Sequence, residues 1–435
     1  MIDLQDLRDR PDAYQEAADR KRMKINVAHV LGMDARRREW ITQVEEMRKE
    51  KNTQSKKIPT LKGGEKAAVL ATMKELSAEL KAKEEELAAI EKDFERHLLD
   101  LPAIPHPSVP VGTDESENVE AYRKGEVPTF AFPIKDHVEL GESLGILDIP
   151  RGVKVAGARS YFLKGDGALL HQAVLRFTID SLVRKGWTLF APPMMARYEC
   201  FRGTGFFPGP DESNIYALGG QESAASPIEP ENLYLIGTSE VTVASFHMDE
   251  VLHLGDLPTR SAGFSQCFRR EAGTYGKDTR GLYRIHQFEK VEQVVLCEAN
   301  PEKAMQMFEA IRTNAEEILQ ALNLPYRVLT MCTGDLGKGK VFQQDIETWM
   351  PSREQYGETH SCSYLGDFQA RRLNIRYEDV DGSKKFVHTL NNTAIASPRI
   401  LIPILELNQQ KDGSVVIPQP LRAYMGGKEV MEPRY

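Results

Sequence analysis

The chain has 435 residues, a mass of 49.0 kDa and a formal net charge of -8 at neutral pH. This length allows two to four domains, and the 41% hydrophobic and 28% charged residues are ordinary for a globular protein. The longest aliphatic run spans only residues 400–405, whereas a membrane-spanning helix needs about 20 apolar residues, so we expect neither such a helix nor a membrane partner.

The first residues, MIDLQDLRDRPDAY, lack the basic start and the apolar stretch of a secretory signal, so we expect none. The five cysteines occur singly, without a C-x-x-C pair: Cys200, Cys267, Cys297, Cys332 and Cys362. This pattern argues against a disulfide framework and against a zinc site, and it favours a cytoplasmic location.

Positive charge is concentrated near the N-terminus. Residues 20–66 hold fourteen Lys and Arg but only six Asp and Glu. Apolar positions spaced by three and four residues run through residues 30–61 and, after Gly63 and Gly64, through residues 69–101. The spacing predicts two helices of about 30 residues, joined at the glycines and packed as an antiparallel coiled-coil hairpin.

The predicted hairpin, about residues 28–101, offers no pocket for small-molecule chemistry. Its basic first helix suits an extended polyanion, because phosphates attract basic side chains independently of sequence. A dimerisation rod with a solvated charged face is the simpler alternative. The four prolines of residues 99–110 predict that the second helix ends at Pro102 and that a stiff linker leads into a new domain.

Beyond the linker, short apolar runs alternate with helical patterns. The candidate strands are residues 187–190, 233–236, 291–295 and 326–331, and the candidate helices are residues 169–183 and 301–322. This order predicts an α+β domain with a mainly antiparallel sheet.

Residues 334–341, GDLGKGKV, are not a phosphate-binding P-loop, because Val stands where the motif needs Ser or Thr. Denser polar chemistry lies in FRRE (268–271) and RIHQFEKVE (284–292), which flank a Gly-rich loop. If these segments form a hairpin, four side chains could surround one site for phosphates or carboxylates: Arg269, Glu271, Arg284 and Glu292. An exposed, salt-bridged hairpin is the alternative.

Glu358 and Ser361 stand three residues apart and could hold Mg²⁺ beside phosphates, although a plain polar loop is the alternative. A thiol nucleophile at Cys362 beside His360 is disfavoured, because neighbours in sequence do not make a catalytic pair.

The segment of residues 397–399, Ser-Pro-Arg, suggests the start of a helix. Pro398 fits the first turn of a helix with Ser397 as its cap, so Arg399 would lie where helices bind anions. A surface arginine is the alternative.

In chain order, these segments closely resemble bacterial-type seryl-tRNA synthetases, which are class II aminoacyl-tRNA synthetases. The resemblance covers nearly the whole chain and rests on DHVELGE (136–142), YFLKGDGALL (161–170), GTG (203–205), LYLIGTSEV (233–241), FRREAGTYGKDTRGL (268–282), HQFEKVE (286–292), DFQARR (367–372) and LRAYMGG (421–427). It implies a tRNA-binding domain over residues 1–104 with the coiled-coil arm, and a catalytic domain over residues 105–435 whose antiparallel sheet is flanked by helices. Motifs 1, 2 and 3 would span about residues 171–193, 264–292 and 390–409.

The resemblance implies a serine–tRNA ligase, which joins L-serine and ATP to seryl-adenylate plus pyrophosphate and then transfers serine to the 3′-terminal ribose of tRNA(Ser). Whether tRNA(Sec) is also a substrate stays open. The implied cofactor is Mg²⁺, without zinc. Motif 1, with its long helix and a strand that carries Pro193, would form a homodimer interface.

The resemblance also implies residue roles. Arg269, Glu271 and Arg399 would be catalytic. Serine would be bound by Thr238, Ser239, Glu240, Arg269, Glu292 and Thr393. ATP would be bound by Arg269, Arg270, Glu271, Arg284, Ile285, His286, Gln287, Phe288, Glu358, Thr359, His360, Ser361 and Arg399, with Mg²⁺ held by Glu358 and Ser361.

Within these sets, Thr238 and Glu240 would hold the serine amino group, and Glu292 and Thr393 its hydroxyl. Arg284 would meet the γ-phosphate side. Phe288 and Arg399 would sandwich the adenine, and the loop of residues 272–283 would meet the tRNA acceptor end.

Three segments depart from the usual family pattern: GTSE (237–240), ETHS (358–361) and NTAIA (392–396). The last lacks the usual glycines, so we expect a changed loop backbone in motif 3. Two other functions remain open, namely a paralogue that loads a small amino acid onto a carrier protein and a non-catalytic RNA-binding coiled-coil protein. The retained hairpin argues against the first, and Arg269, Arg284 and Arg399 argue against the second.

Overall fold

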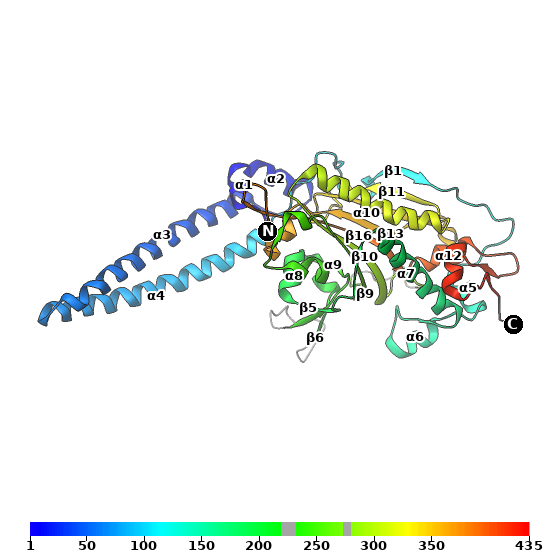
Figure 1. Ribbon diagram of the computed structural model, residues 1–435, viewed down its shortest axis with the longest axis horizontal. Coiled ribbons are helices and arrows are strands. Elements are labelled where there is room, and N and C mark those ends of the chain that lie inside the picture. The colour runs from blue at the N-terminus through cyan, green and yellow to red at the C-terminus, as the bar shows by residue number, and fades with distance from the viewer. Residues whose placement is uncertain (219–231, 273–279, 435) are drawn as a thin grey trace. The chain divides into compact units, whose positions relative to one another are not determined.

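The computed structural model describes residues 1–218, 232–272 and 280–434 (Figure 1). The chain separates into two compact units, Met1–Pro102 and Ala103–Tyr435. In the described residues, no helix combines the length and the apolar character needed to cross a membrane.

The first unit consists of α1 (Leu4–Asp9), α2 (Pro11–Arg20), α3 (Val27–Lys57) and α4 (Gly63–Asp100). The 31 residues of α3 and the 38 of α4 form the long hairpin. The expected turn at the two glycines is wrong, because the turn lies at residues 58–62 and Gly63 already begins α4. Pro59 explains this position, since proline cannot continue the hydrogen-bond pattern of α3. The second helix ends just before Pro102, as predicted.

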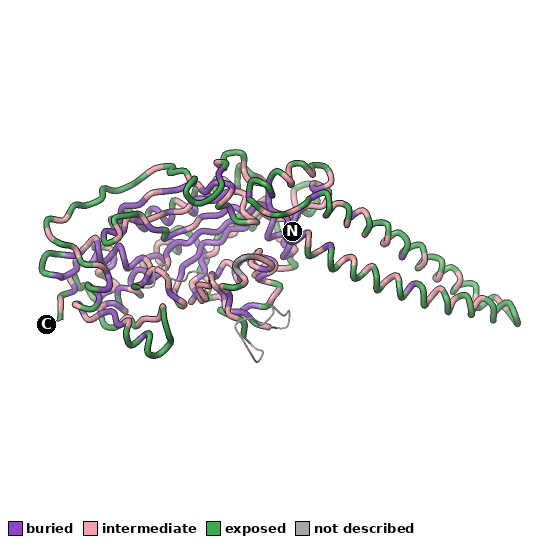
Figure 2. The backbone as a smooth tube through the Cα atoms, turned by 180° about the vertical axis from the view of Figure 1, so that it is seen from behind, coloured by how far each residue is buried: buried purple, intermediate pink, exposed green. Residues whose placement is uncertain are grey.

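Burial along the hairpin follows the predicted spacing. Val30, Val44, Leu80 and Phe94 are buried, while most other positions are exposed (Figure 2). Arg37 is a polar residue at one of these spaced positions, and its guanidinium lies over the Phe94 ring at 5.6 Å. The contact face was therefore visible in the sequence.

The second unit is built on an eight-stranded sheet in the order β1-β11-β12-β13-β16-β10-β9-β4. Its strands are β1 (Val119–Lys124), β4 (Thr188–Phe190), β9 (Thr259–Phe268), β10 (Gln287–Cys297), β11 (Tyr326–Thr330), β12 (Phe342–Met350), β13 (Gln355–Tyr364) and β16 (His388–Ser397). All neighbours are antiparallel except β4 and β9. The predicted α+β class with a mainly antiparallel sheet is confirmed.

Helices cover both faces of this sheet. On one face, α7 (Asp166–Arg184) and α10 (Pro301–Ala321) share a core with Val291 and Val295 of β10. On the other face, Val294 and Leu296 pack with a second cluster that includes α9 (Glu240–Ala244) and α11 (Phe368–Leu373). Alternate residues of β10 thus point to opposite faces, as the period of two requires.

Smaller elements surround the sheet. The helices are α5 (His137–Ser143), α6 (Ile149–Ala156), α8 (Tyr198–Thr204), α12 (Leu401–Leu407) and α13 (Gln419–Arg422). The short strands are β2 (Leu147–Asp148), β3 (Phe162–Leu163), β5 (Met195–Arg197), β6 (Tyr216–Leu218), β7 (Leu233–Leu235), β8 (Val251–His253), β14 (Arg376–Glu378), β15 (Lys384–Phe386), β17 (Val415–Val416) and β18 (Val430–Met431).

Two local expectations are wrong. Pro193 lies between β4 and β5 rather than in a strand. Ser397 is the last residue of β16 and caps no helix, because its hydroxyl is hydrogen-bonded to His171 at 2.8 Å and α12 begins only at Leu401. Residues 334–340 form a loop that precedes β12 and no helix, as expected for a segment that is not a P-loop.

Candidate active site

One cavity gathers eight of the eighteen residues predicted to bind ATP or serine. It is lined by Arg269, Glu271, Leu282, Tyr283, Ile285, Phe288, Lys290, Glu358, Thr359, Thr393, Ala396 and Arg399. These residues come from β10, β13 and β16, from the segment between β9 and β10, and from the turn that follows β16. Segments far apart in the sequence therefore meet at one end of the sheet.

Arg269 follows the last residue of β9 and is held in place from three sides. Its backbone amide donates to His286 O at 2.9 Å, and its Nε donates to Gly237 O at 3.3 Å. Its guanidinium lies over the Phe288 ring at 5.2 Å. A fixed cation with an aromatic face beside it suits a phosphate or carboxylate next to a planar base.

A β-bulge in β16 shapes the serine part of the cavity. Val291 pairs with Ile395, but Glu292 pairs with Thr393, so Ala394 is an extra residue. Because of this extra residue, Thr393 and Ala396 line the same cavity although they stand three apart.

The motif 3 segment is a strand rather than a loop, because residues 388–397 form the continuous β16. The bulge does not require glycine, since Ala394 is not among the residues with a positive φ.

Glu292 lies at the bottom of this region, with 2% of its surface exposed. Lys290 Nζ is 2.5 Å from Glu292 Oε2, and the Thr393 hydroxyl donates to the same oxygen at 3.3 Å. Both of these contacts are made to the same carboxylate oxygen, Oε2.

Glu240 adds a second, half-buried carboxylate from the start of α9. Burial, reinforced by the negative charge of Glu292, raises the pKa of Glu240 to about 7. Gln369 Nε2 donates to Glu240 Oε1 at 2.7 Å. Such a carboxylate is well suited to a ligand ammonium, which would offset the repulsion.

A second bulge, in β13, places Glu358 and Ser361 together. Ile346 of β12 pairs with His360, but Glu347 pairs with Glu358, so Thr359 is an extra residue. Glu358 and Ser361 therefore share a face, whereas a regular strand would turn residues three apart to opposite faces.

Asp345 lies on that face too, opposite Ser361. Burial and the charge of Glu358 raise the pKa of Asp345 to about 7, against hydrogen bonds from Gln343 and Ser361. Carboxylate and hydroxyl oxygens are the donors that Mg²⁺ prefers, and a divalent cation would relieve the repulsion between the acids. The donor set at Glu358 and Ser361 therefore fits the implied Mg²⁺. No group of three or more His, Cys, Asp or Glu suited to a metal occurs among the described residues.

His360 lies beneath the two bulges and is 1% exposed. Its Nδ1 is 2.8 Å from the Thr359 hydroxyl and its Nε2 is 3.1 Å from Ala394 O, so the ring joins both bulges. Burial lowers the pKa of His360 to about 4 and raises that of the Cys362 thiol far above its usual value. A thiolate pair is thus excluded for these two residues, as expected.

Arg399 closes one side of the cavity. Its Nε donates to Tyr283 O at 3.1 Å, its Nη1 donates to Glu358 O at 3.0 Å, and its guanidinium lies over the Tyr283 ring at 4.5 Å. Arg353 lies over the same ring at 4.4 Å. Tyr283 was not predicted, and no sequence pattern identifies this stack.

His137 anchors the segment that carries Tyr283. Its Nε2 accepts from the amide of Leu282 at 3.1 Å, and its Nδ1 is 2.8 Å from Glu406 Oε1. Glu406 is fully buried and also accepts from the amide and hydroxyl of Ser352. Gly281 is required beside this ring, because its φ is +88° and a Cβ would lie 2.2 Å from His137 Nε2.

Several predicted residues lie outside the cavity lining. Arg284 Nη1 donates to Glu271 Oε2 at 3.1 Å, and the amide of Arg270 donates to Asn214 O at 2.8 Å. Ser239 is fully buried and its hydroxyl donates to Gly263 O at 3.1 Å, so this side chain faces the sheet. His286 and Gln287 line a neighbouring cavity. Most of the predicted tRNA loop, residues 273–279, lies outside the described residues.

Lys290 was not predicted as a site residue, although the sequence contains a pattern that identifies it. Phe288, Lys290 and Glu292 alternate along β10 and so share one face, which the period of two predicts once the strand is accepted. Asp345 and Gln369 could not be found in this way, because their proximity depends on pairing between distant strands and helices.

Known proteins resemble both units. The family described as "Seryl-tRNA synthetase N-terminal domain" matches residues 1–105, and "tRNA synthetase class II core domain (G, H, P, S and T)" matches residues 226–408. The serine–tRNA ligases of Deinococcus radiodurans and Dictyoglomus turgidum are 47% and 41% identical to this chain over 99% of each chain. A crystal structure of seryl-tRNA synthetase from Pyrococcus horikoshii complexed with ATP matches over the full length of both chains, with a TM-score of 0.88 and 36% identity.

Proposed function

The chain belongs to the family of seryl-tRNA synthetases and is a serine–tRNA ligase, and from that premise we propose how its residues divide the two steps of the reaction. The observation that carries the assignment is the meeting of Arg269, Phe288, Glu358, Thr393 and Arg399 in one cavity. In the first step, a serine carboxylate oxygen attacks the α-phosphorus of ATP and pyrophosphate leaves. In the second, a tRNA ribose hydroxyl displaces AMP from the adenylate.

We assign stabilisation of the first step to arginines. Arg269 binds the serine carboxylate and the α-phosphate, while Glu271 orients Arg284 toward the γ-phosphate side through their 3.1 Å contact. Phe288 and Arg399 hold the adenine. Fixed cations lower the energy of the developing phosphate charge without any protein nucleophile.

We assign serine recognition to the two carboxylates. Glu240, with Thr238, binds the amino group, and Glu292 Oε1 accepts a hydrogen bond from the serine hydroxyl. Alanine would leave this buried carboxylate oxygen unpaired, and sites built on such a bond reject the shorter analogue by about 10⁴–10⁵. Ser239 and His360 contribute only backbone atoms, because the Ser239 hydroxyl donates to Gly263 O and the His360 ring contacts Ala394 O.

We assign Mg²⁺ to Glu358 and Ser361. When bound, the ion would neutralise charge on the phosphate oxygens of ATP. The bulge at Thr359 supports this pair, because it places both oxygen donors on one face.

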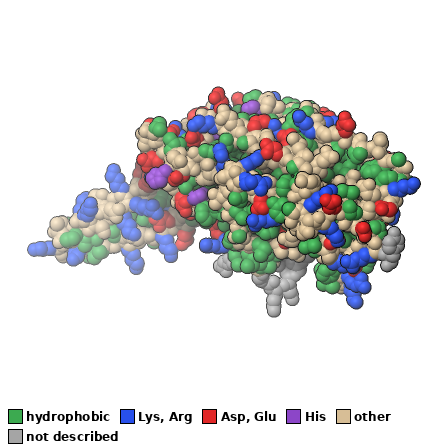
Figure 3. Space-filling model, turned by 45° about the vertical axis from the view of Figure 1, so that its right-hand side comes forward, with side chains coloured by type: hydrophobic (Ala, Val, Ile, Leu, Met, Phe, Trp, Pro, Cys, Tyr) green, Lys and Arg blue, Asp and Glu red, His purple; other side chains and the backbone are tan. Residues whose placement is uncertain are grey.

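We assign tRNA(Ser) binding to the hairpin. Lys and Arg side chains are spread along its surface (Figure 3), and the segment of residues 20–66 holds fourteen Lys and Arg against six Asp and Glu. A long basic helix such as α3, which offers no small-molecule cavity, suits a polyanion. Since all five cysteines are free thiols, we also place the protein in the reducing cytoplasm.

We assign a homodimer to motif 1. In and directly beside motif 1, five apolar side chains are each 43–50% exposed, namely Leu169, Val183, Leu189, Met194 and Met195, and β4 is an edge strand of the large sheet. Exposed apolar side chains beside an open edge favour pairing with a second copy. Sedimentation of a single 49.0 kDa species at micromolar concentration would contradict this assignment.

The decisive experiment is ATP–pyrophosphate exchange with serine, alanine, glycine, threonine and cysteine, each without tRNA. We expect exchange with serine alone, followed by charging of tRNA(Ser) when it is added. Exchange with a different amino acid would indicate a paralogue, and no exchange by folded protein would refute the residue assignments.

A further inference from the structure

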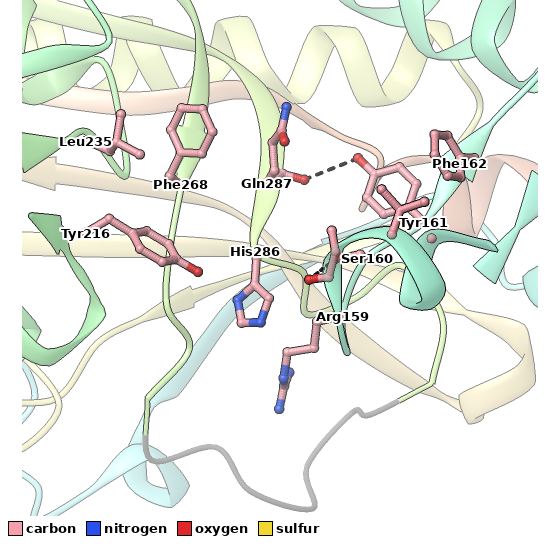
Figure 4. Close-up of a pocket in the computed structure, with 12 residues that line it drawn as sticks. Arg159, Ser160, Tyr161, Phe162, Tyr216, Leu235, Phe268, His286 and Gln287 are labelled. Carbon is pink, nitrogen blue, oxygen red and sulfur yellow. Dashed lines mark hydrogen bonds between the residues drawn. The ribbon is translucent and has the colours of Figure 1, made fainter. Parts of the chain in front are cut away.

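A second cavity, of about 600 Å³, lies beside the active site (Figure 4). It is lined by Gly152, Val155, Ala156, Arg159, Ser160, Tyr161, Phe162, Tyr216, Leu235, Phe268, His286 and Gln287. In Figure 4, Tyr216 lies on one side and Arg159 and Tyr161 on the other, with His286 between them. No function has been assigned above to the cavity itself.

Hydrogen bonds join the walls of this cavity to the hairpin formed by β9 and β10. The Tyr161 hydroxyl donates to Gln287 O at 3.2 Å, and the amide of His286 donates to Arg159 O at 3.4 Å. Gly152 lets α6 approach closely, because a Cβ there would lie 2.5 Å from the backbone of Tyr161. Contacts of α6 and of the segment after it with the start of β10 therefore hold the walls of the cavity in place.

The cavity and the active site share one stretch of backbone. Phe268 and Gln287 line the second cavity, whereas the next residues, Arg269 and Phe288, line the active site. Successive strand residues point to opposite faces, so the two cavities lie on opposite faces of the same hairpin end. His286 joins them, because its Nδ1 is 2.9 Å from Arg269 O.

The lining has the chemistry of a nucleotide site. Tyr161, Phe162, Tyr216 and Phe268 supply aromatic faces on which a base can stack, and Arg159 supplies a cation for a phosphate. Among the described residues that line the cavity there is no Asp or Glu. An anion is thus favoured over a cationic ligand.

We propose that this cavity binds an unpaired nucleotide at the 3′ end of tRNA, upstream of the terminal ribose that receives serine. The proposal rests on the proposed function, because that reaction must bring the tRNA end to Arg269. The terminal nucleotide itself does not fit the assignment, because its ribose must reach the opposite face of the hairpin. Base stacking is tolerant of sequence, so the site positions the strand rather than identifying it.

A thermodynamic cycle between protein and RNA tests the proposal. We would measure the affinity of two tRNA(Ser) transcripts at one salt concentration, one of full length and one lacking its last three nucleotides. Each is measured with the wild-type protein, Arg159→Gln and Tyr216→Leu. We expect truncation to weaken wild-type binding about tenfold. Both variants should bind full-length tRNA about tenfold more weakly than wild type, yet bind truncated tRNA as wild type does.

The matched control is Arg151→Gln, which removes a charge from the preceding helix α6 at a side chain that is 76% exposed and does not line the cavity. It should change neither affinity. Serine-dependent pyrophosphate exchange is measured in parallel, because loss of exchange in wild type would refute the proposed function rather than this site.

Two results would overturn the proposal. Equal weakening of both transcripts would show that the cavity does not read the 3′ end. A change of sedimentation in the variants, with normal tRNA binding per protomer, would make the cavity a contact between two copies of the chain. If Tyr216→Leu fails to fold, Arg159→Gln decides alone, since Arg159 belongs to neither of the hydrophobic clusters that pack on the two faces of the sheet.

Discussion

At the residue scale, Glu240 is a carboxyl whose charge is disfavoured in the empty site. Its pKa of about 7 reflects burial first and the charge of Glu292 second. Protonated Glu240 cannot pair with the serine ammonium, so kcat/KM for serine should fall about tenfold per pH unit below pH 7. Exchange kinetics from pH 5.5 to 8.5 measure this. Glu240→Gln should lower kcat/KM and flatten the profile, whereas Glu250→Gln, a change at an exposed carboxylate, should leave the profile intact.

The same shift predicts a stability effect of opposite sign. The folded pKa of Glu240 lies above the ordinary value of 4.5, so folding stability is lost as pH rises from about 4.5 through 7. Glu240→Gln should therefore stabilise the serine-free protein at pH 8 by roughly 2–3 kcal/mol, and not at pH 4. Urea unfolding at both pH values checks this. Equal stability at pH 8 would mean that Glu240 is ionised without penalty.

Thr393 tests the hydroxyl subsite. Thr393→Val keeps the shape of the side chain but removes the 3.3 Å hydrogen bond to Glu292. A hydrogen bond to a charged group contributes about 1.5–3 kcal/mol, so KM for serine should rise roughly 10- to 100-fold with KM for ATP within about twofold. Thr178→Val is the control, because that buried hydroxyl bonds only Val174 O within α7. Unchanged serine kinetics would remove Thr393 from the pocket.

At the element scale, the segment of residues 281–283 is held by His137. His137→Asn keeps a donor near Glu406 but removes the acceptor for the amide of Leu282. We expect a rise in KM for ATP of about tenfold or more, since Tyr283 and Arg399 stack beside the nucleotide site. His137→Gln, which can still accept from Leu282, should retain ATP binding better. Urea unfolding separates this positioning effect from a loss of fold, and equal KM values in both variants would refute it.

The sequence predicted elements better than it predicted their details. Periodicity located the hairpin stripe at Val30, Val44 and Leu80, because each buried position repeats every three or four residues. The turn was misplaced because glycine tolerates a helix start, whereas Pro59 ends one. Strand β16 was read as a loop and a capped helix, since a bulge leaves no periodic signature.

The site was predicted mainly through resemblance, and its geometry was not. The family motifs predicted that Arg269, Phe288 and Arg399 lie together, and all three line the same cavity. The positions of Tyr283, Lys290 and Asp345 depend on pairing between strands far apart in the chain, which a single sequence does not encode in a readable form.

At the scale of the whole molecule, one unit carries the cavity and the other carries the basic helix α3. Lys49, Lys56 and Lys57 are exposed on α3. Changing all three to Gln should leave serine-dependent exchange unchanged, but weaken tRNA(Ser) binding and reduce its salt dependence by roughly one unit of slope per lost phosphate contact. Filter binding over a range of salt concentrations measures this.

The control for this prediction neutralises as many exposed lysines on the other unit: Lys303, Lys384 and Lys411. If those changes reduce the salt slope as much as the changes on α3, the hairpin has no special part in tRNA binding.

The bulges at Thr359 and Ala394 make the catalytic unit sensitive to the number of residues in its strands. Glu358 and Ser361 share a face only because one extra residue lies between them, and the same holds for Thr393 and Ala396. Loss of one residue from either interval would appear as a single gap in an alignment, with every motif side chain still present. One side chain of the pair would nevertheless turn to the far face of the sheet. Relatives of this chain should therefore tolerate substitution in these intervals far better than any change in their length.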